Sequence, residues 1–320
     1  MSALSDRSVL GSSAPDHAAS DEALTHHAAS IQADGCPRAL HAPTNPPMTT
    51  PAVYQGMDRA TLDAAYDNTR AVADSATLLA DFERRSTDMR ARPDARLDMR
   101  YGPAPRQRID YFPASRPGPL LIFIHGGYWQ MRAKETFSFL AAGPNAHGIH
   151  VAMIGYTLAP DTNMAGIVAE VRAGIRWLRE HASAFGADVD KMVVSGWSAG
   201  GHLAAMCLDE DGICGGVAIS GIFDLEPIRH CYLNEKLQLS QQDIDDFSPL
   251  TLPCVPKPLS ICVGQAELLA LQRQSLAFSR ARHDYPGDTV LLPGHNHFSI
   301  LYELSRADGA LTMQVRALLR

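Results

Sequence analysis

The chain has 320 residues, 46% of them hydrophobic and 20% charged, which is the composition of a soluble globular protein with a large core. Its formal net charge of −7 argues against a nucleic-acid partner, because the scattered lysines and arginines form no basic stripe that would neutralise phosphates. No apolar run is long enough to span a membrane, and the N-terminus lacks the basic-then-apolar pattern of a signal peptide. We therefore expect a cytoplasmic protein that contacts no membrane.

The first fifty residues differ in composition from the rest. Residues 1–50 are rich in Ala, Ser, Thr, His and Pro, and such a segment buries too little apolar surface to offset the entropy lost on ordering. We predict a disordered low-complexity tail over 1–50 and one α/β domain over 51–320. The sequence leaves open whether Met48 or Met57 is the biological start.

No metal site or organic cofactor is expected. The six cysteines match no zinc or redox spacing, and a chain this long does not need a disulfide framework, so we interpret them as mostly buried free thiols. The acids at 243, 245 and 246 are interpreted as solvated helix-cap residues rather than as a metal cluster.

The first elements predicted are helices followed by a hairpin. Apolar residues recur at helical spacing from 58 to 92, which predicts N-terminal helices over 51–92. Segments 96–101 and 107–112 alternate like paired strands on either side of Gly102-Pro-Ala-Pro105, and predict an antiparallel hairpin at the edge of the sheet.

From residue 119 onward, predicted strands and helices alternate. The strands are expected over 119–124, 149–154, 192–194, 215–220, 259–263 and 289–292, and the helices over 134–147, 164–185, 201–208, 268–282 and from 307 or 310 onward. Such alternation predicts an α/β fold with a mostly parallel, doubly wound sheet. The longer connection over 221–258 is expected to overhang the pocket as a small cap, because ligands in such sheets bind beyond the C-terminal ends of the strands.

The candidate nucleophile is Ser198. It lies in Gly196-Trp-Ser-Ala-Gly200 between an apolar strand and a helix, the context in which G-x-S-x-G indicates a nucleophile elbow. A serine on so tight a turn is forced toward disallowed backbone angles, and glycine two residues to either side relieves the crowding. The hydroxyl then lies at a helix N-terminus, where developing negative charge is favoured.

A second motif, His125-Gly126-Gly127, directly follows the strand over 119–124. Consecutive glycines let the backbone approach a ligand closely with N–H groups directed at an oxygen. In serine hydrolases with such a loop, one of its N–H groups joins that of the residue after the nucleophile, here Ala199, in the oxyanion hole. We therefore predict an oxyanion hole at Gly126, Gly127 and Ala199, with His125 holding the loop.

The next two residues, Tyr128 and Trp129, are candidates to line the substrate pocket and stack on an aromatic ring. Plain packing is the alternative interpretation of Trp129.

A base and an acid complete the constellation that a serine nucleophile needs. In this fold the order along the chain is Ser, acid, His, on loops after successive strands. Two histidines follow the last predicted strand, His295 and His297, and their position does not separate them. Glu267 is the predicted acid, with a structural role at a helix N-terminus as its alternative. Asp224, after the preceding strand, is the competitor.

The chain beyond the tail resembles the kynurenine formamidase (arylformamidase) group of α/β-hydrolases, near the hormone-sensitive-lipase-like esterases. The resemblance rests on His125-Gly-Gly-Tyr-Trp129, Gly196-Trp-Ser-Ala-Gly-Gly-His202 and Asn296-His-Phe298. In this group the base immediately precedes the phenylalanine, which selects His297 over its neighbour. The group usually has an aspartate where this chain has Glu267.

The resemblance implies a serine hydrolase that cleaves an aryl formamide such as N-formyl-L-kynurenine to the free amine and formate, without a cofactor. Two alternatives stay open: a general carboxylesterase or amidase for small aromatic or short-acyl substrates, and a non-catalytic relative that binds a small molecule. The predicted partner is a small-molecule substrate. The oligomeric state is left open, a homodimer included.

Overall fold

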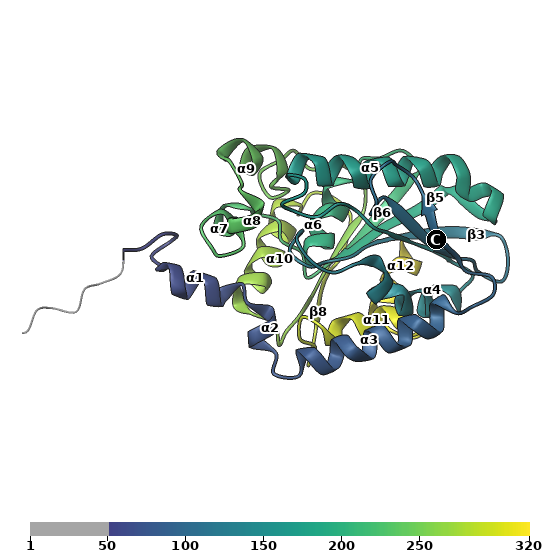
Figure 1. Cartoon of the computed structure of the whole chain (residues 1–320), viewed down its shortest axis with the longest axis horizontal. Coiled ribbons are helices and arrows are strands. Elements are labelled where there is room, and N and C mark those ends of the chain that lie inside the picture. Colours follow the sequence, from purple (N-terminus) through teal and green to yellow (C-terminus); the bar gives the residue numbers. More distant parts are fainter. Residues whose placement is uncertain (1–50) are drawn as a thin grey trace, which may run out of the picture. The chain divides into compact units, whose positions relative to one another are not determined.

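Eight strands form one sheet in a computed structural model that describes residues 51–320 (Figure 1). The strands are β1 (Arg96–Arg100), β2 (Arg108–Phe112), β3 (Gly118–Ile124), β4 (His150–Ile154), β5 (Ala187–Trp197), β6 (Ile213–Ile219), β7 (Leu259–Gly264) and β8 (Thr289–Leu292). Their order across the sheet is β1-β2-β4-β3-β5-β6-β7-β8. Strand β2 is antiparallel to both of its neighbours, and all other pairs are parallel. The tail predicted over 1–50 lies outside the described residues.

Most helices alternate with these strands, and three precede the sheet. The α-helices are α1 (Arg59–Ala65), α2 (Asn68–Ala71), α3 (Ser75–Arg90), α4 (Ala142–Asn145), α5 (Met164–His181), α6 (Ala199–Met206), α7 (Glu226–Arg229), α8 (Asn234–Leu237), α9 (Gln241–Phe247), α10 (Leu269–Ala281), α11 (Tyr302–Ser305) and α12 (Ala310–Ala317). Three 3-10 helices are η1 (Lys134–Ala141), η2 (Ala182–Phe185) and η3 (Ser299–Leu301). Within residues 51–320, no helix combines the length and apolar character needed to cross a bilayer.

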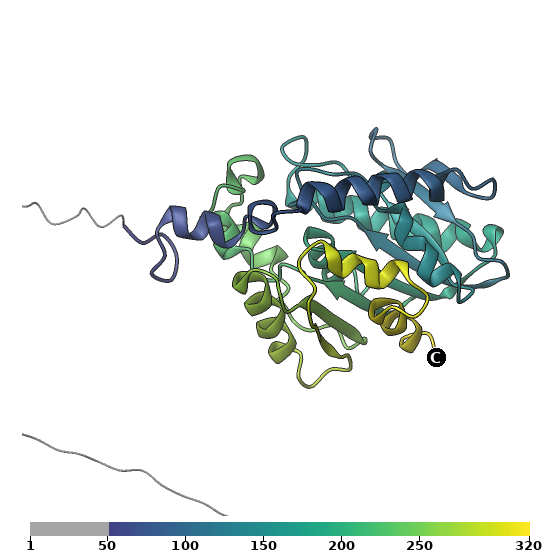
Figure 2. The same cartoon turned by 90° about the horizontal axis from the view of Figure 1, so that it is seen from below.

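Helices cover both faces of the sheet, as expected for a doubly wound fold. Successive side chains of a strand point to opposite faces. On β3, Leu120 packs in the same apolar cluster as Ile167 of α5, whereas the next residue, Leu121, packs in a second cluster with Phe82 of α3. Helices α5 and α3 lie on opposite sides of the sheet in Figure 1, and the side that carries α3 faces the viewer in Figure 2. The predicted α/β class and parallel sheet are confirmed.

Two elements differ from their predictions. The strand predicted over 192–194 is the buried end of β5, whose 11 residues begin in a half-exposed stretch, so the apolar run marked only part of it. The segment predicted as an α-helix over 134–147 is mainly the 3-10 helix η1. The Phe139 N–H donates to Ser86 Oγ of α3 at 3.0 Å, which diverts it from the ladder of an α-helix.

A buried lysine at the start of η1 ties the edge of the sheet to the helices. The Lys134 ammonium lies 2.7 Å from Asp98, 2.8 Å from Asp110 and 2.6 Å from Glu135. Arg90 of α3 also pairs with Asp110. The hydrogen bond from Lys134 lowers the pKa of Asp98 below its ordinary value. The three carboxylates converge on this ammonium, which occupies the place that a bound cation would take.

Replacing Lys134 by methionine should destabilise the fold. The change keeps an apolar stem but leaves the fully buried Asp110 with one cation instead of two, and we expect a loss of about 3 kcal/mol in the free energy of unfolding. Denaturant titration measures it. Lys191→Met is the matched control, because that side chain is 62% exposed and 3.7 Å from Asp188, and its effect should stay below about 1 kcal/mol. Equal effects of the two changes would contradict a stabilising role for the Lys134 cluster.

Candidate active site

The tightest turn in the sheet carries Ser198. This residue joins the end of β5 to the start of α6 with φ 58° and ψ −120°, a backbone conformation that side-chain-bearing residues rarely adopt. Its amide donates to Ile219 O at 2.8 Å, which anchors the turn to β6. A Cβ on Gly196 would collide with the Gly200 carbonyl, and a Cβ on Gly200 would collide with the Ile124 carbonyl. The geometry of a nucleophile elbow is therefore present, and no side chain fits at Gly196 or Gly200.

The glycine loop after β3 lies directly against this turn. A Cβ built on Gly126 would lie 3.0 Å from Ser198 Cβ and 2.6 Å from Trp197 O, so only glycine fits between them. Gly127 has φ 113°, in the region that favours glycine. Within residues 51–320, the amides of Gly126, Gly127 and Ala199 donate to no other backbone carbonyl, which leaves them free to bind an oxygen.

His125 holds this loop. Its Nδ1 lies 2.8 Å from Gly126 O, and its own carbonyl accepts the Tyr156 hydroxyl at 2.9 Å. The ring is stacked on Tyr156, with 4.4 Å between centroids, and lies parallel to Phe137. Burial lowers the pKa of His125 to about 4, so the ring is neutral at physiological pH. These contacts agree with the predicted loop-holding role.

Of the two candidate histidines, His297 is the one that meets a carboxylate in the core. Its Nδ1 lies 2.7 Å from Glu267 Oε2, and both side chains are almost fully buried. His295 lies elsewhere on the loop, with Nε2 3.7 Å from Glu303. Asp224 accepts hydrogen bonds from the Glu226 amide and the Tyr54 hydroxyl instead, and it contacts neither histidine.

Three further residues orient this pair, and none of their contacts was predicted from the sequence. Ser220, at the end of β6, donates its hydroxyl to Glu267 Oε1 at 2.6 Å, and the Gly264 amide donates to the same oxygen at 2.7 Å. Both donors occupy Oε1, so Oε2 is left for the imidazole. The Trp197 indole N–H donates to His297 O at 2.7 Å, and the two rings lie 4.7 Å apart. The residue before Ser198 thus holds the loop that carries His297.

The expectation that Trp129 lines the pocket is corrected by its position. Its side chain is fully buried, and its indole N–H donates to His202 Nδ1 at 3.2 Å, so it offers no surface to a ligand. The other nitrogen of His202 lies 2.7 Å from Phe247 O. Tyr128 is 8% exposed, and its hydroxyl donates to the Tyr66 carbonyl. It links the glycine loop to the N-terminal helices rather than facing the cavity.

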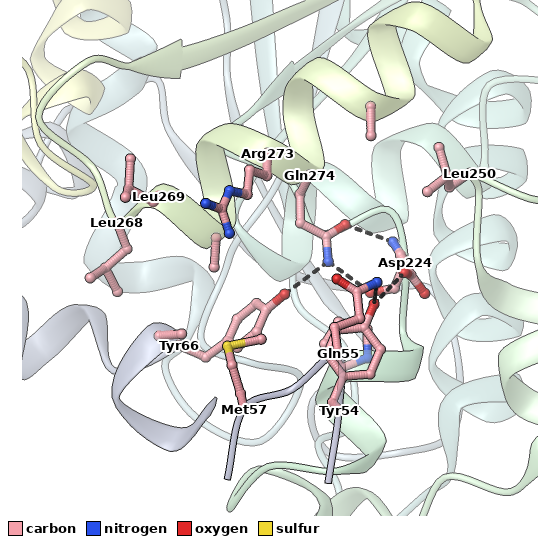
Figure 3. Close-up of a pocket in the computed structure, with 14 residues that line it drawn as sticks. Tyr54, Gln55, Met57, Tyr66, Asp224, Leu250, Leu268, Leu269, Arg273 and Gln274 are labelled. Carbon is pink, nitrogen blue, oxygen red and sulfur yellow. Dashed lines mark hydrogen bonds between the residues drawn. The ribbon is translucent and has the colours of Figure 1, made fainter. Parts of the chain in front are cut away.

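A pocket of 520 Å³, within the usual range for small-molecule sites, is lined by residues that follow Ser220 and Glu267 in the chain (Figure 3). None of the proposed catalytic or oxyanion-hole residues is among its lining residues. Tyr54 and Tyr66 form one wall, Asp224 comes from the connection after β6, and Leu268 and Arg273 come from the segment after Glu267. Burial raises the pKa of Tyr54 to about 12 and raises the pKa of Asp224 above its ordinary value.

Known proteins that are similar to this chain are hydrolases. The BD-FAE family model matches residues 111–211. A kynurenine formamidase of Salmo salar is 32% identical over 238 residues, which cover 68% of this chain and 79% of that protein. A solved structure from Silicibacter sp. matches with a TM-score of 0.72 and 28% identity, covering 80% of this chain and 98% of that one. An esterase of Pyrobaculum calidifontis shares the fold, with a TM-score of 0.60, 17% identity, and coverage of 77% and 93%.

The buried His202 predicts a specific dependence of stability on pH. Burial lowers its pKa from 6.5 to about 4, so between these values the unfolded chain binds a proton that the folded chain excludes. The free energy of unfolding therefore falls as pH falls, by about 2 kcal/mol from this residue between pH 7 and pH 5. His202→Gln should flatten the pH dependence measured by denaturant titration by that amount. The exposed His181, changed to Gln, is the control, and an unchanged slope in both variants would contradict the argument.

Proposed function

The chain belongs to the kynurenine formamidase family of α/β-hydrolases, and on that basis we propose that it hydrolyses the formamide of an N-formylated aromatic amine such as N-formyl-L-kynurenine. The products are the free arylamine and formate. The observation that carries the proposal is the hydrogen bond between His297, on the loop after β8, and Glu267, on the loop after β7. The strained turn at Ser198 accompanies it. The identity of the substrate is inferred from membership in the family.

In the first half of the reaction, Ser198 is the nucleophile. His297 Nε2 removes the hydroxyl proton as the oxygen attacks the formyl carbon, and Glu267 stabilises the imidazolium through Nδ1. The carbonyl oxygen becomes an oxyanion that the free amides of Gly126 or Gly127 and Ala199 bind. One such donor contributes about 2.7–4 kcal/mol to stabilising the transition state.

Collapse of this intermediate breaks the carbon–nitrogen bond. The imidazolium of His297 gives its proton to the leaving arylamine, which departs neutral, and the formyl group stays as an ester on Ser198. A water then attacks the ester carbon while His297 takes one of its protons. The second intermediate collapses to formate and regenerates the serine hydroxyl, so every proton removed is returned.

The second candidate is a carboxylesterase for small aromatic or short-acyl esters. Its support is the likeness of the fold to esterases, and the same proposed triad would cleave an ester without change. The two candidates differ in the acyl group and in the leaving group. An arylamine needs a proton from His297, whereas a phenolate leaves without one.

Catalytic efficiency on two substrates separates the candidates. We expect kcat/KM for N-formyl-L-kynurenine to exceed that for p-nitrophenyl acetate, and Ser198→Ala to lower both by about 10⁴-fold or more, because attack on the carbonyl is lost. Release of kynurenine followed by absorbance measures the first reaction. Cleavage of the ester alone would favour the carboxylesterase, and hydrolysis that survives Ser198→Ala would overturn the proposed nucleophile.

Loss of the Ser220 hydroxyl should weaken catalysis without unfolding the protein. Ser220→Ala removes one of two donors to Glu267 Oε1, so the carboxylate can rotate away from His297, and we expect kcat/KM to fall about tenfold. The pH profile of kcat/KM should shift as well, because the imidazolium is less well stabilised. Ser260→Ala is the control, since this equally buried serine donates to Gln314 instead. Identical profiles for wild type and Ser220→Ala would exclude the positioning role.

A further inference from the structure

Three chain segments that line the 520 Å³ pocket are joined by sequence or by hydrogen bonds to the proposed catalytic site. Leu268, in one wall, is the residue after Glu267. Asp224, in another wall, follows Ser220 by four residues, and Ser220 is bound to Glu267. Tyr66, in the third wall, accepts the Tyr128 hydroxyl at the end of the glycine loop. Residues next to Glu267, residues after β6 and a residue bonded to the glycine loop therefore line the same cavity.

Two oppositely charged side chains line this mostly apolar cavity, and within residues 51–320 neither forms an ion pair. Arg273 of α10 lines it, and within residues 51–320 no carboxylate lies in ion-pair range of its guanidinium. Asp224 also lines it, half-buried, with only neutral donors at its oxygens in the part of the chain that the structure describes: the Glu226 amide at 2.9 Å and the Tyr54 hydroxyl at 3.4 Å. A half-buried carboxylate of this kind is stabilised by a cation, and the exposed guanidinium of Arg273 can pair with an anion that enters the cavity.

The side-chain amide of Gln274 lies next to both charged side chains. In Figure 3, the Gln274 side chain lies between the Arg273 guanidinium and Asp224. Its Oε1 accepts the Asp224 amide at 2.8 Å, and its Nε2 donates to Asp224 O at 2.9 Å and to the Tyr66 hydroxyl at 3.1 Å. Both ends of the Gln274 amide are thus occupied by protein groups. The amide fixes the position of Asp224, and the two charged side chains remain available to a ligand.

We propose that this pocket binds the α-amino acid end of the substrate, with Arg273 pairing with its carboxylate and Asp224 with its ammonium. The inference rests on the proposed formamidase function and adds the two residues that determine specificity for an amino acid on the arylamine. Tyr54, Met57 and Leu268 supply apolar surface for the body of the ligand. The two opposite charges favour an amino acid over simple formanilides, because only the amino acid forms an ion pair with each of them.

Three formamides with two, one and no charged groups test the inference. They are N-formyl-L-kynurenine, its analogue with hydrogen in place of the α-amino group, and ortho-formamidoacetophenone, which has neither charge. Arg273→Gln should lower kcat/KM for the two acids about tenfold or more relative to the uncharged compound, since a charge-assisted pair is lost. Asp224→Asn, which keeps an oxygen acceptor, should lower the efficiency on N-formyl-L-kynurenine relative to both analogues.

The control variant is Arg280→Gln, an exposed arginine about two turns further along α10 that does not line the pocket. It should leave the efficiency on all three substrates unchanged. Arg273→Lys, which keeps the positive charge, should restore part of the preference for acids. Equal losses on all three substrates in Arg273→Gln, or no loss on any, would overturn the pairing with a carboxylate.

Failure of this inference is distinguishable from failure of the proposed function. Wild-type hydrolysis of ortho-formamidoacetophenone as efficient as that of N-formyl-L-kynurenine would keep the formamidase function and reject the amino-acid pocket. Absence of hydrolysis of all three would reject the formamidase function. In that case calorimetric binding of L-kynurenine decides about the pocket: affinity about tenfold weaker in Arg273→Gln than in wild type would support it, and equal affinities would overturn it.

Discussion

The steric constraint at Ser198 is the feature on which the rest of the site depends. With φ at 58°, the serine backbone is held in a rare conformation, and this is possible only because β3, β5 and α6 approach more closely than side chains would allow. Gly126, Gly196 and Gly200 each fill a space with no room for a Cβ. The same close approach brings the free amides of the glycine loop beside the hydroxyl, so strain at the turn and preorganisation of the loop have one cause.

The acid side of the site is organised by hydrogen bonds rather than by sterics. Glu267 is bound through both oxygens, by Ser220 and Gly264 on one and by His297 on the other. A glutamate side chain has one more rotatable bond than the aspartate usual in this family, and these bonds offset that freedom. The departure from the family pattern at Glu267 is therefore compatible with a fixed imidazole, because neighbouring strands supply the missing rigidity.

Local patterns predicted the doubly wound sheet, the Ser198 turn and the glycine loop, because each depends on residues that are close in sequence. Contacts over longer separations could not be predicted. Ser220 reaches Glu267 across 47 positions, and a serine after a strand carries no local sign of such a bond. The sequence did not separate His295 from His297 by position, since both lie on one loop and differ only in which ring points to the core. The sequence left pocket lining and plain packing both open for Trp129, because its burial depends on His202 of another element.

The N-terminal segment has a part in the site that its position before the sheet does not suggest. Tyr54 and Tyr66 form a wall of the pocket, yet this segment carries none of the proposed catalytic groups. Within residues 51–320, it is joined to the glycine loop by the hydrogen bonds that Tyr128 forms with Asn68 and with the Tyr66 carbonyl. Ligand preference can therefore diverge between descendants of this protein by changes ahead of the first strand, while the hydrolytic core is inherited intact.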